Sequence, residues 1–521
     1  MPMSTSNAST MAMAMDMEQM NMVFFTSTKT LLWAKDFAPT TTGQYAGVCI
    51  FLIAFATIFR MLLALRINFY SIRDGLRRRR TKGLLAEHQI GGIDPLMHQY
   101  NASISYDKHL YKEDILGSIA FARANAKSGI ISNDEFTEIE RGLREVMKEW
   151  EAGTFTIMPN DEDIHTANER RLSEIIGKEI GGKLHTGRSR NEQVVTDMRM
   201  WLRERIREIE SYLVAFLQVI AGRAEADIDH IMPGYTHLQL AMPVKFSQWL
   251  LSYGFSFASD LERLREVLKR VNRSPLGAGA LAGNAFGIDR QMMAKELGFE
   301  GIMWNSMGAV ADRDFVTEFL SWGTMFMGHI SRFSEDLIIY STAEFGFKKN
   351  PDGLELLRGK AGRAFGHFAG VYVATKGIPS TYNKDLQESW EPMLDHVKTV
   401  SDSVQIANGI LSTLKLRPDR MRASLNPFLL ATDVADALVR LGVPFRETHH
   451  ISGRVVAKSE ELGIPMDQLS LEQLQAIDSR FPDNIKDVFN YEASVESRNA
   501  QGGTSRAGVL EQIEVLKGML N

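Results

Sequence analysis

Five polar segments of this 521-residue chain carry side chains that could bind an organic anion or move a proton. Helical amphipathicity explains none of them, so each is either a binding segment or a structural turn or helix cap. Taken alone, the first and the last are better explained as a helix cap and as polar turns. The segments are Asn101–Asp107, Asn160–Arg170, Lys183–Gln193, Pro233–Gln239, and Lys349–Asp352 together with Ser380–Gln387.

The segment Lys183–Gln193 gathers the most donors, with two arginines, two hydroxyl groups, a histidine and an asparagine around Gly187. Arginine presents a planar set of N–H donors that matches a carboxylate. A basic turn with helix caps explains this density of donors less well, so the segment is predicted to bind a carboxylate.

Two further histidines lie in the other polar segments. His237 lies shortly before a long predicted helix, and histidine is the usual acid or base at neutral pH. A lone histidine is more often structural, so this prediction depends on the neighbouring segments. His165 and Glu169 are one helical turn apart, but no third ligand is suitably spaced, which argues against a metal site there.

The elements that must position these segments are long helices, because strand-period alternation is scarce from about Asp94 onward. Around Thr196 to Ala224 apolar residues recur mostly at steps of three and four, which marks a buried helix face. Some helices are apolar nearly all round, so the sequence predicts an all-α bundle that oligomerises through them. Further long runs are residues 245–271, 314–345, 354–376 and 393–414.

Composition limits the classes of function. A net charge of −5 with 24% charged residues predicts a soluble body and gives no sign of a nucleic-acid partner. The single cysteine, Cys49, excludes an internal disulfide framework and a cysteine-rich zinc site. A cytosolic, reducing environment is therefore expected for the bulk of the chain.

The N-terminal part differs from the rest. Residues 45–66 are apolar enough for one membrane helix, and basic residues crowd the stretch that follows. By the positive-inside rule the N-terminus would lie outside, which predicts a membrane-anchored chain. Thioether sulfurs before this helix suit Cu(I), although a disordered, biased tail explains them too. The candidate Cu(I) ligands are Met11, Met13, Met15, Met17, Met20 and Met22.

Residues 11–65 resemble the start of a fungal-type Ctr copper transporter. The match rests on the Met-x-Met run, on residues 20–28 and on Gly43–Gly47 before the apolar stretch. Members of that family have second and third membrane helices, with Met-x-x-x-Met and Gly-x-x-x-Gly patterns, that this chain lacks. The resemblance implies copper handling, but this fragment cannot build the family's pore.

The remainder, from about Asp94 to Asn521, resembles the argininosuccinate lyase family of the fumarase/aspartase superfamily. The segments NDEDIHTANER, HTGRSRN and PGYTHLQ occur together and in the family's order. The resemblance implies an all-α homotetramer around a 20-helix core, with each active site shared by three subunits. It implies no cofactor for the lyase reaction.

The resemblance also implies the reaction, in which argininosuccinate is split into fumarate and L-arginine, the last step of arginine biosynthesis and a step of the urea cycle. A base removes a proton beside a carboxylate, and an acid assists departure of the guanidino nitrogen. His237 carries over as an acid/base residue. The substrate-binding residues that carry over are Ser103, Arg190, Asn191, Thr236, Asn350, Tyr382 and Gln387.

One departure from the family concerns a loop with the signature Gly-Ser-Ser-x-Met-Pro-x-Lys-x-Asn, whose serine is usually assigned as a catalytic acid/base. Here Phe347 runs directly into Lys348, and only the end of the signature remains. The catalytic serine therefore has no counterpart, and Asn350 is expected to be displaced. Trp390 stands where members often have a lysine, which affects one substrate contact.

The predicted function is argininosuccinate lyase activity, impaired by the missing loop. The alternatives are a catalytically inactive subunit with the lyase fold and a copper-transport component that acts through the N-terminal segment. The predicted parts are a Met-rich disordered tail (1–44), a transmembrane helix (45–66), a basic linker (67–93), a lyase N-terminal domain (94–190), a central helical bundle (191–422) and a lyase C-terminal domain (423–521).

Overall fold

The computed structural model describes residues 95–347 and 350–520. The chain divides into two units, Met1–Met97 and His98–Asn521, and the elements below belong almost entirely to the second. The Met-rich tail, the membrane helix and the basic linker predicted for residues 1–93 lie outside the described residues. The boundaries predicted within the lyase part are not tested by this division and stay predictions.

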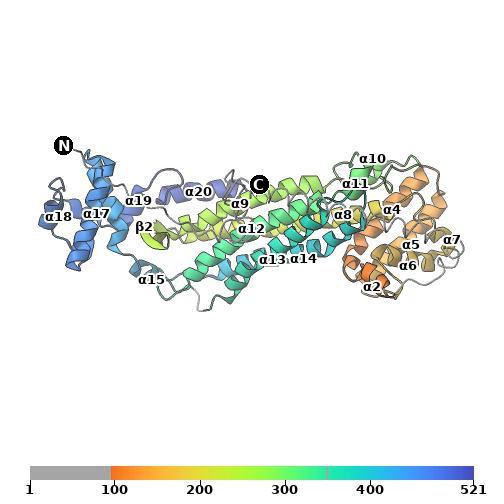
Figure 1. Cartoon of the computed structure of the whole chain (residues 1–521), viewed down its shortest axis with the longest axis horizontal. Coiled ribbons are helices and arrows are strands. Elements are labelled where there is room, and N and C mark those ends of the chain that lie inside the picture. The colour runs from red at the N-terminus through yellow and green to blue at the C-terminus, as the bar shows by residue number, and fades with distance from the viewer. Residues whose placement is uncertain (1–94, 348–349, 521) are drawn as a thin grey trace, which may run out of the picture. The chain divides into compact units, whose positions relative to one another are not determined.

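Helices dominate the described residues, which confirms the predicted all-α class (Figure 1). The N-terminal helices are α2 (Pro95–Asn101), α3 (Ile104–Asp107), α4 (Tyr111–Lys127), α5 (Asn133–Glu151), α6 (Ile164–Ile176) and α7 (Lys178–Gly181). The central helices are α8 (Arg190–Ala226), α9 (Phe246–Val271), α10 (Arg290–Glu296), α11 (Ser306–Ala311), α12 (Asp314–Ile339), α13 (Asp352–Thr375) and α14 (Trp390–Thr413).

The C-terminal part is built from shorter helices with their own small core. Its helices are α15 (Pro418–Ala423), α16 (Ala431–Arg440), α17 (Phe445–Leu462), α18 (Leu471–Ile477) and α19 (Tyr491–Ser497), and α20 (Arg506–Gly518) packs back on α8 and α9. Short 3-10 helices complete the chain: η3 (Lys108–Leu110), η4 (Lys384–Ser389), η5 (Pro427–Leu430), η6 (Met466–Gln468) and η7 (Ile485–Val488).

Five long helices, α8, α9, α12, α13 and α14, lie side by side and share the main core (Figure 1). On α8 the apolar residues at steps of three and four, such as Ile206, Ile209 and Leu213, are buried, as their periodicity predicts. Each such side chain contributes roughly 1.5–3 kcal/mol when it is buried. The bundle is therefore a rigid base for the polar segments at its helix ends.

The helix predicted at residues 314–345 is shorter in the structure, because α12 ends at Ile339. In the connector that follows, the side chains of Phe345 and Phe347 are buried in the main core, with ring centroids 6.0 Å apart. Gly346 between them has a φ of +63°, which glycine adopts at little cost. Burial of the two aromatic rings thus ends the helix earlier than its apolar pattern suggests.

One β-hairpin interrupts the helices of the described residues, although the sequence shows few strand signals. Strands β1 (Ile231–Thr236) and β2 (Gln239–Lys245) pair antiparallel through a two-residue turn. Pro233 lies opposite Pro243 in this ladder, and proline is what weakens a strand prediction from sequence. The hairpin connects α8 to α9 and carries His237 at its tip.

The predicted membrane-anchored localisation, with the N-terminus outside, needs a correction. Within residues 95–347 and 350–520, no helix combines the length and the apolarity that crossing a bilayer requires. Even the apolar α12 carries charged residues along its length, among them Glu318, Arg332 and Asp336. This finding overturns that localisation. The predicted membrane helix at residues 45–66 is itself outside the described residues.

Candidate active site

Five of the eight predicted site residues line one cavity of about 100 Å³ at the start of α8. They come from the α2–α3 turn, from the first turn of α8 and from the segment around η4. The predicted carboxylate-binding segment and one of the polar turns therefore meet in the fold. The five are Ser103, Arg190, Asn191, Tyr382 and Gln387, and other lining residues are Asp107, Glu162, Asp163, His165 and Lys384. We call this space the α8 cavity.

Arg190 and Asn191 are placed by the N-terminus of α8. Ser189 caps this helix, because its Oγ accepts the backbone N–H of Asn191 at 3.2 Å and its own N–H donates to Glu192 at 2.9 Å. Arg190 donates to the carboxylate of Asp163 at 2.8 Å. The positive end of a helix dipole and a guanidinium group thus lie at one cavity, which favours a bound anion.

Two aspartates form part of the wall opposite. Asp107 accepts the hydroxyl of Ser103 at 2.6 Å and, at 3.1 Å, the backbone N–H of the first residue of α6. Burial raises the pKa of Asp107 to about 6. Asp163 caps α6, and although burial raises its pKa, the charges of His165 and Arg190 lower the pKa below the ordinary value. The wall therefore holds one ionised carboxylate and one carboxyl that titrates in the mildly acidic range.

Tyr382 and Gln387 enter from the segment around η4. Gln387 Nε2 donates to the backbone oxygen of Asn101 at 3.2 Å and to the hydroxyl of Tyr106 at 3.0 Å, so it ties η4 to the first helices. Thr381 has a φ of +71°, and such strain in a non-glycine residue costs on the order of 1–3 kcal/mol. Burial raises the pKa of Tyr382, so its hydroxyl stays protonated as a donor.

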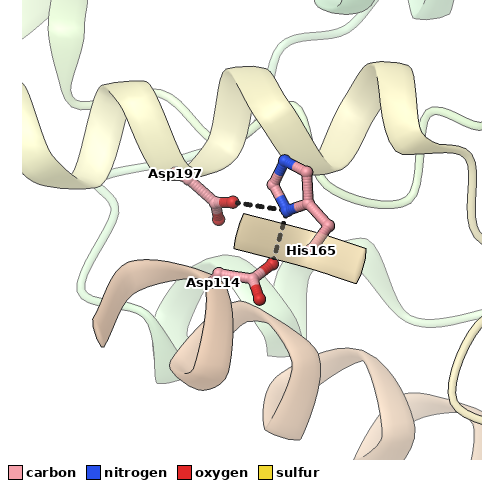
Figure 2. Close-up of side chains that lie close together, drawn as sticks. All are labelled: Asp114, His165 and Asp197. Atoms are coloured by element: carbon pink, nitrogen blue, oxygen red, sulfur yellow. Dashed lines mark hydrogen bonds and ion pairs between the residues drawn. The ribbon is translucent and has the colours of Figure 1, made fainter. Parts of the chain in front are cut away.

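Beside the cavity a buried histidine lies between two aspartates (Figure 2). His165 Nδ1 donates to Asp114 Oδ1 at 2.8 Å and lies 3.6 Å from Asp197 Oδ2. Asp114 also accepts the side-chain amides of Asn168, at 2.7 Å, and of Gln193. The charged residues come from α4, α6 and α8, so this network fixes three helices at the cavity wall.

Oxygen or nitrogen atoms of Asp114, His165 and Asp197 all lie within 4.8 Å of one another, a spacing at which such atoms could bind a metal ion. Both oxygens of Asp114 accept hydrogen bonds, and Nδ1 of His165 carries one, so these atoms are not free to coordinate. Glu169, the other candidate ligand in the sequence, pairs with Nε2 of His185 at 3.0 Å instead. Within the described residues the cluster is joined by hydrogen bonds, and Glu169 is not one of its members.

Thr236 and His237 lie at the hairpin, away from the lining of the α8 cavity. His237 and Leu238 form the two-residue turn, with φ values of +55° and +58°. Two left-handed residues define a type I′ turn, which usually takes Asn or Gly, and each costs roughly 1–2 kcal/mol for other residues. His237 lines a second hollow of about 910 Å³, between the hairpin, α9 and the connector after α12.

Asn350 is exposed just before α13 and lines neither hollow. The connector before it holds one serine, Ser341, whose hydroxyl donates to the backbone oxygen of Leu337 at 2.7 Å. The connector is also tied to α15, because Arg420 donates to the backbone oxygen of Ala343 at 3.1 Å. This serine is therefore engaged with the end of α12.

Sequence reasoning missed part of the wall. Asp107, Asp163 and His165 occur in segments that a helix start explains equally well, so their types alone did not mark them. Asp114 lies inside a helix and gives no local signal, and Gln193 ends a predicted binding segment but was not singled out within it. Only the packing of α4 against both α6 and α8 buries them together.

Comparison with solved structures identifies the class of protein to which this fold belongs. The fold is similar to that in "Crystal structure of EDDS lyase in complex with formate", with a TM-score of 0.73, 26% identity, and coverage of 82% of this chain and 90% of that one. It is also similar to a fumarate lyase from Mesorhizobium sp. BNC1, with a TM-score of 0.66 and 20% identity over 80% of this chain and 98% of that one. The chain has the mostly helical fold of the fumarase/aspartase-type lyases.

Proteins similar in sequence identify the family within this class of lyases. The chain is 57% identical over 443 residues to a "Probable argininosuccinate lyase" of Schizosaccharomyces pombe, covering 82% of this chain and 96% of the relative. It is 54% identical over 449 residues to the argininosuccinate lyase of Saccharomyces paradoxus, covering 83% and 97%. The lyase family model matches residues 90–348, and the argininosuccinate lyase C-terminal model matches residues 428–496. The chain belongs to the argininosuccinate lyase family, as its motifs predicted.

The N-terminal resemblance is also confirmed at the level of the family. The Ctr copper transporter family model matches residues 22–90. The matched residues and the six candidate Cu(I) ligands all lie outside the residues that the structure describes, so these ligands stay a prediction from sequence.

Proposed function

We propose that the chain is an argininosuccinate lyase, a carbon–nitrogen lyase that splits argininosuccinate into fumarate and L-arginine. The observation that carries this proposal is the α8 cavity, where five residues of the family's binding set converge in a chain whose relatives bear that activity. Its donors suit a substrate with several carboxylates.

In the proposed chemistry, a base removes a proton beside a carboxylate and negative charge spreads onto that carboxylate. Arg190, Asn191 and the N-terminus of α8 supply positive charge and N–H donors for such an anion. Ser103 and Tyr382 supply hydroxyl donors, and Gln387 holds the η4 segment in place. His237 is the proposed acid/base residue, with Thr236 beside it.

Assembly completes the proposed site. Within one chain His237 and the α8 cavity belong to different hollows, so the proposed site takes the hairpin of a second subunit and the Asn350 segment of a third. Exposed apolar side chains on α13 offer a surface for this homotetramer. They are Leu356, Phe365, Tyr372 and Val373.

The connector after α12 limits the proposed activity. A loop that closes over the substrate needs freedom to move, whereas Phe345 and Phe347 are buried in the main core. The proposed enzyme therefore turns over slowly, because one of its two proton-transfer groups is missing. General acid or base catalysis contributes about 10²–10⁴-fold to rate.

The test is fumarate release from argininosuccinate by the purified full chain, followed by ultraviolet absorbance. A matched variant carries the missing Gly-Ser-Ser loop inserted between Phe347 and Lys348, and it should be faster by about 10²–10⁴-fold. No fumarate from either protein, although both assemble, would overturn the proposal.

The packed connector specifically favours a second candidate, a subunit that keeps the lyase fold without turnover. It predicts assembly and substrate binding with no fumarate from the natural chain, and turnover only in the loop-restored variant. Copper handling by the N-terminal segment rests on the family match to residues 22–90 and stays a prediction. A copper-uptake rescue assay with the full chain tests it.

A further inference from the structure

The ring of His165 uses only one of its two nitrogens. Its side chain is buried at 2% exposure and contributes to the lining of the α8 cavity. Nδ1 is bound to Asp114, whereas Nε2 is buried without a hydrogen-bond partner. Figure 2 shows Nε2 directed away from both carboxylates, on the far side of the ring.

The surroundings of the ring favour its charged form. Asp114 is the nearest carboxylate, and Asp107 and Asp163 also lower the energy of a positive ring. Although burial lowers the pKa of His165, these three carboxylates together raise it above the ordinary value. A protonated imidazole carries an N–H on both nitrogens, so Nε2 becomes a donor.

An unpaired N–H of a buried, charged ring is costly. Asp114 cannot turn the ring to satisfy the second nitrogen, because amides of Asn168 and Gln193 hold its own oxygens. Asp197 does not compete for Nε2, since its 3.6 Å approach is to Nδ1. An acceptor that enters the cavity is therefore the partner that this nitrogen lacks.

We propose that His165 is a substrate-binding residue, which donates from Nε2 to a carboxylate oxygen of the bound substrate while Asp114 holds the ring in orientation. This inference rests on the proposed function, because it assumes an anionic substrate in the α8 cavity. Asp114 is then a positioning residue, since it acts only through the ring of His165.

Two amide variants separate this role from a purely structural one. In His165→Gln the side-chain amide reaches the place of Nε2 and keeps a donor toward the cavity. In His165→Asn the amide reaches only the place of Nδ1 and keeps the donor toward Asp114. The inference predicts that His165→Gln binds the substrate more tightly than His165→Asn does. A purely structural role predicts that His165→Asn is both the more stable variant and the one that binds more tightly.

The experiment measures argininosuccinate binding by calorimetry on the assembled full chain, together with thermal unfolding of each variant. Loss of one hydrogen bond to a charged group weakens binding on the order of tenfold or more, so His165→Asn should bind at least that much more weakly than the natural chain. His165→Gln should bind between the two, and it should unfold at a lower temperature than His165→Asn because Asp114 loses one of its three hydrogen bonds and keeps those from Asn168 and Gln193.

The outcomes are distinguishable. Equal binding by the two variants, or weaker binding by His165→Gln, overturns the inference while it leaves the proposed function standing. Failure of the natural chain itself to bind argininosuccinate overturns the proposed function, and this inference with it. His329→Asn is the matched control, because Nδ1 of His329 also pairs with an aspartate, Asp260, at 2.6 Å, whereas its ring does not line the α8 cavity; its binding should stay within about twofold of the natural chain.

Discussion

The α8 cavity and the hairpin turn hold residues of one proposed reaction, yet their local structures differ. In the cavity, Ser103 and Arg190 are fixed by hydrogen bonds to aspartates, and their backbones are relaxed. At the hairpin, His237 sits in a strained left-handed turn. One chain therefore preorganises the proposed substrate-binding residues by itself, whereas it holds the proposed acid/base residue at an exposed, strained tip.

The largest effect is expected at the hairpin. His237→Asn removes the imidazole but suits the left-handed turn, since asparagine adopts that backbone readily. Fumarate release should fall by about 10²–10⁴-fold relative to the loop-restored parent, with unchanged or higher thermal stability. If activity survives, the hairpin is a structural element and the comparison fails.

The next largest effect is expected in the pH dependence of stability, through Asp107 in the wall of the α8 cavity. The pKa of Asp107 is about 6 in the fold against 3.8 as an isolated group, so the folded state prefers the protonated form. The contribution of Asp107 to the unfolding free energy is greatest at low pH and is lost as pH rises through about 6. This contribution amounts to at most roughly 3 kcal/mol. Asp107→Asn keeps an acceptor for the hydroxyl of Ser103. Between about pH 4 and about pH 7, a range that roughly spans the two pKa values, the unfolding free energy of this variant should fall less than that of the natural chain. Parallel pH curves for the two proteins would contradict this account.

A smaller effect is expected for Arg190→Lys. Lysine keeps the charge and can still reach Asp163, but it loses the planar fork that matches a carboxylate. The KM of the loop-restored enzyme should rise about tenfold with little change in unfolding temperature. Asp163→Asn serves as the control for the ion pair, and a larger effect there than at Arg190 would mean that the arginine is structural.

The smallest effect is expected from relieving the backbone strain of the hairpin turn. Leu238 is 73% exposed and contributes little to the core, so Leu238→Gly should relieve its left-handed backbone. The unfolding free energy should rise by up to about 1 kcal/mol, with turnover of the loop-restored parent preserved. A loss of stability in urea unfolding would show that this side chain is held by contacts stronger than the strain.

The sequence predicted the helices well because burial follows periodicity, as Ile206 and Leu213 on α8 illustrate. Five of the residues that it predicted for the site meet at the α8 cavity, whereas Thr236, His237 and Asn350 do not. It failed where distant packing decides the outcome. The hairpin was hidden by its prolines, and the early end of α12 depends on two aromatic rings that bury themselves in the connector.

Local residue order was enough to predict the family and the helical class, and it shows that the chain contains no Gly-Ser-Ser sequence. Two features depend on tertiary packing: Asp114 holds His165 beside the cavity, and His237 lies at another hollow of the same chain. The reason is physical. Burial and hydrogen bonding join residues far apart in sequence, and no local pattern records which buried polar atom is left without a partner.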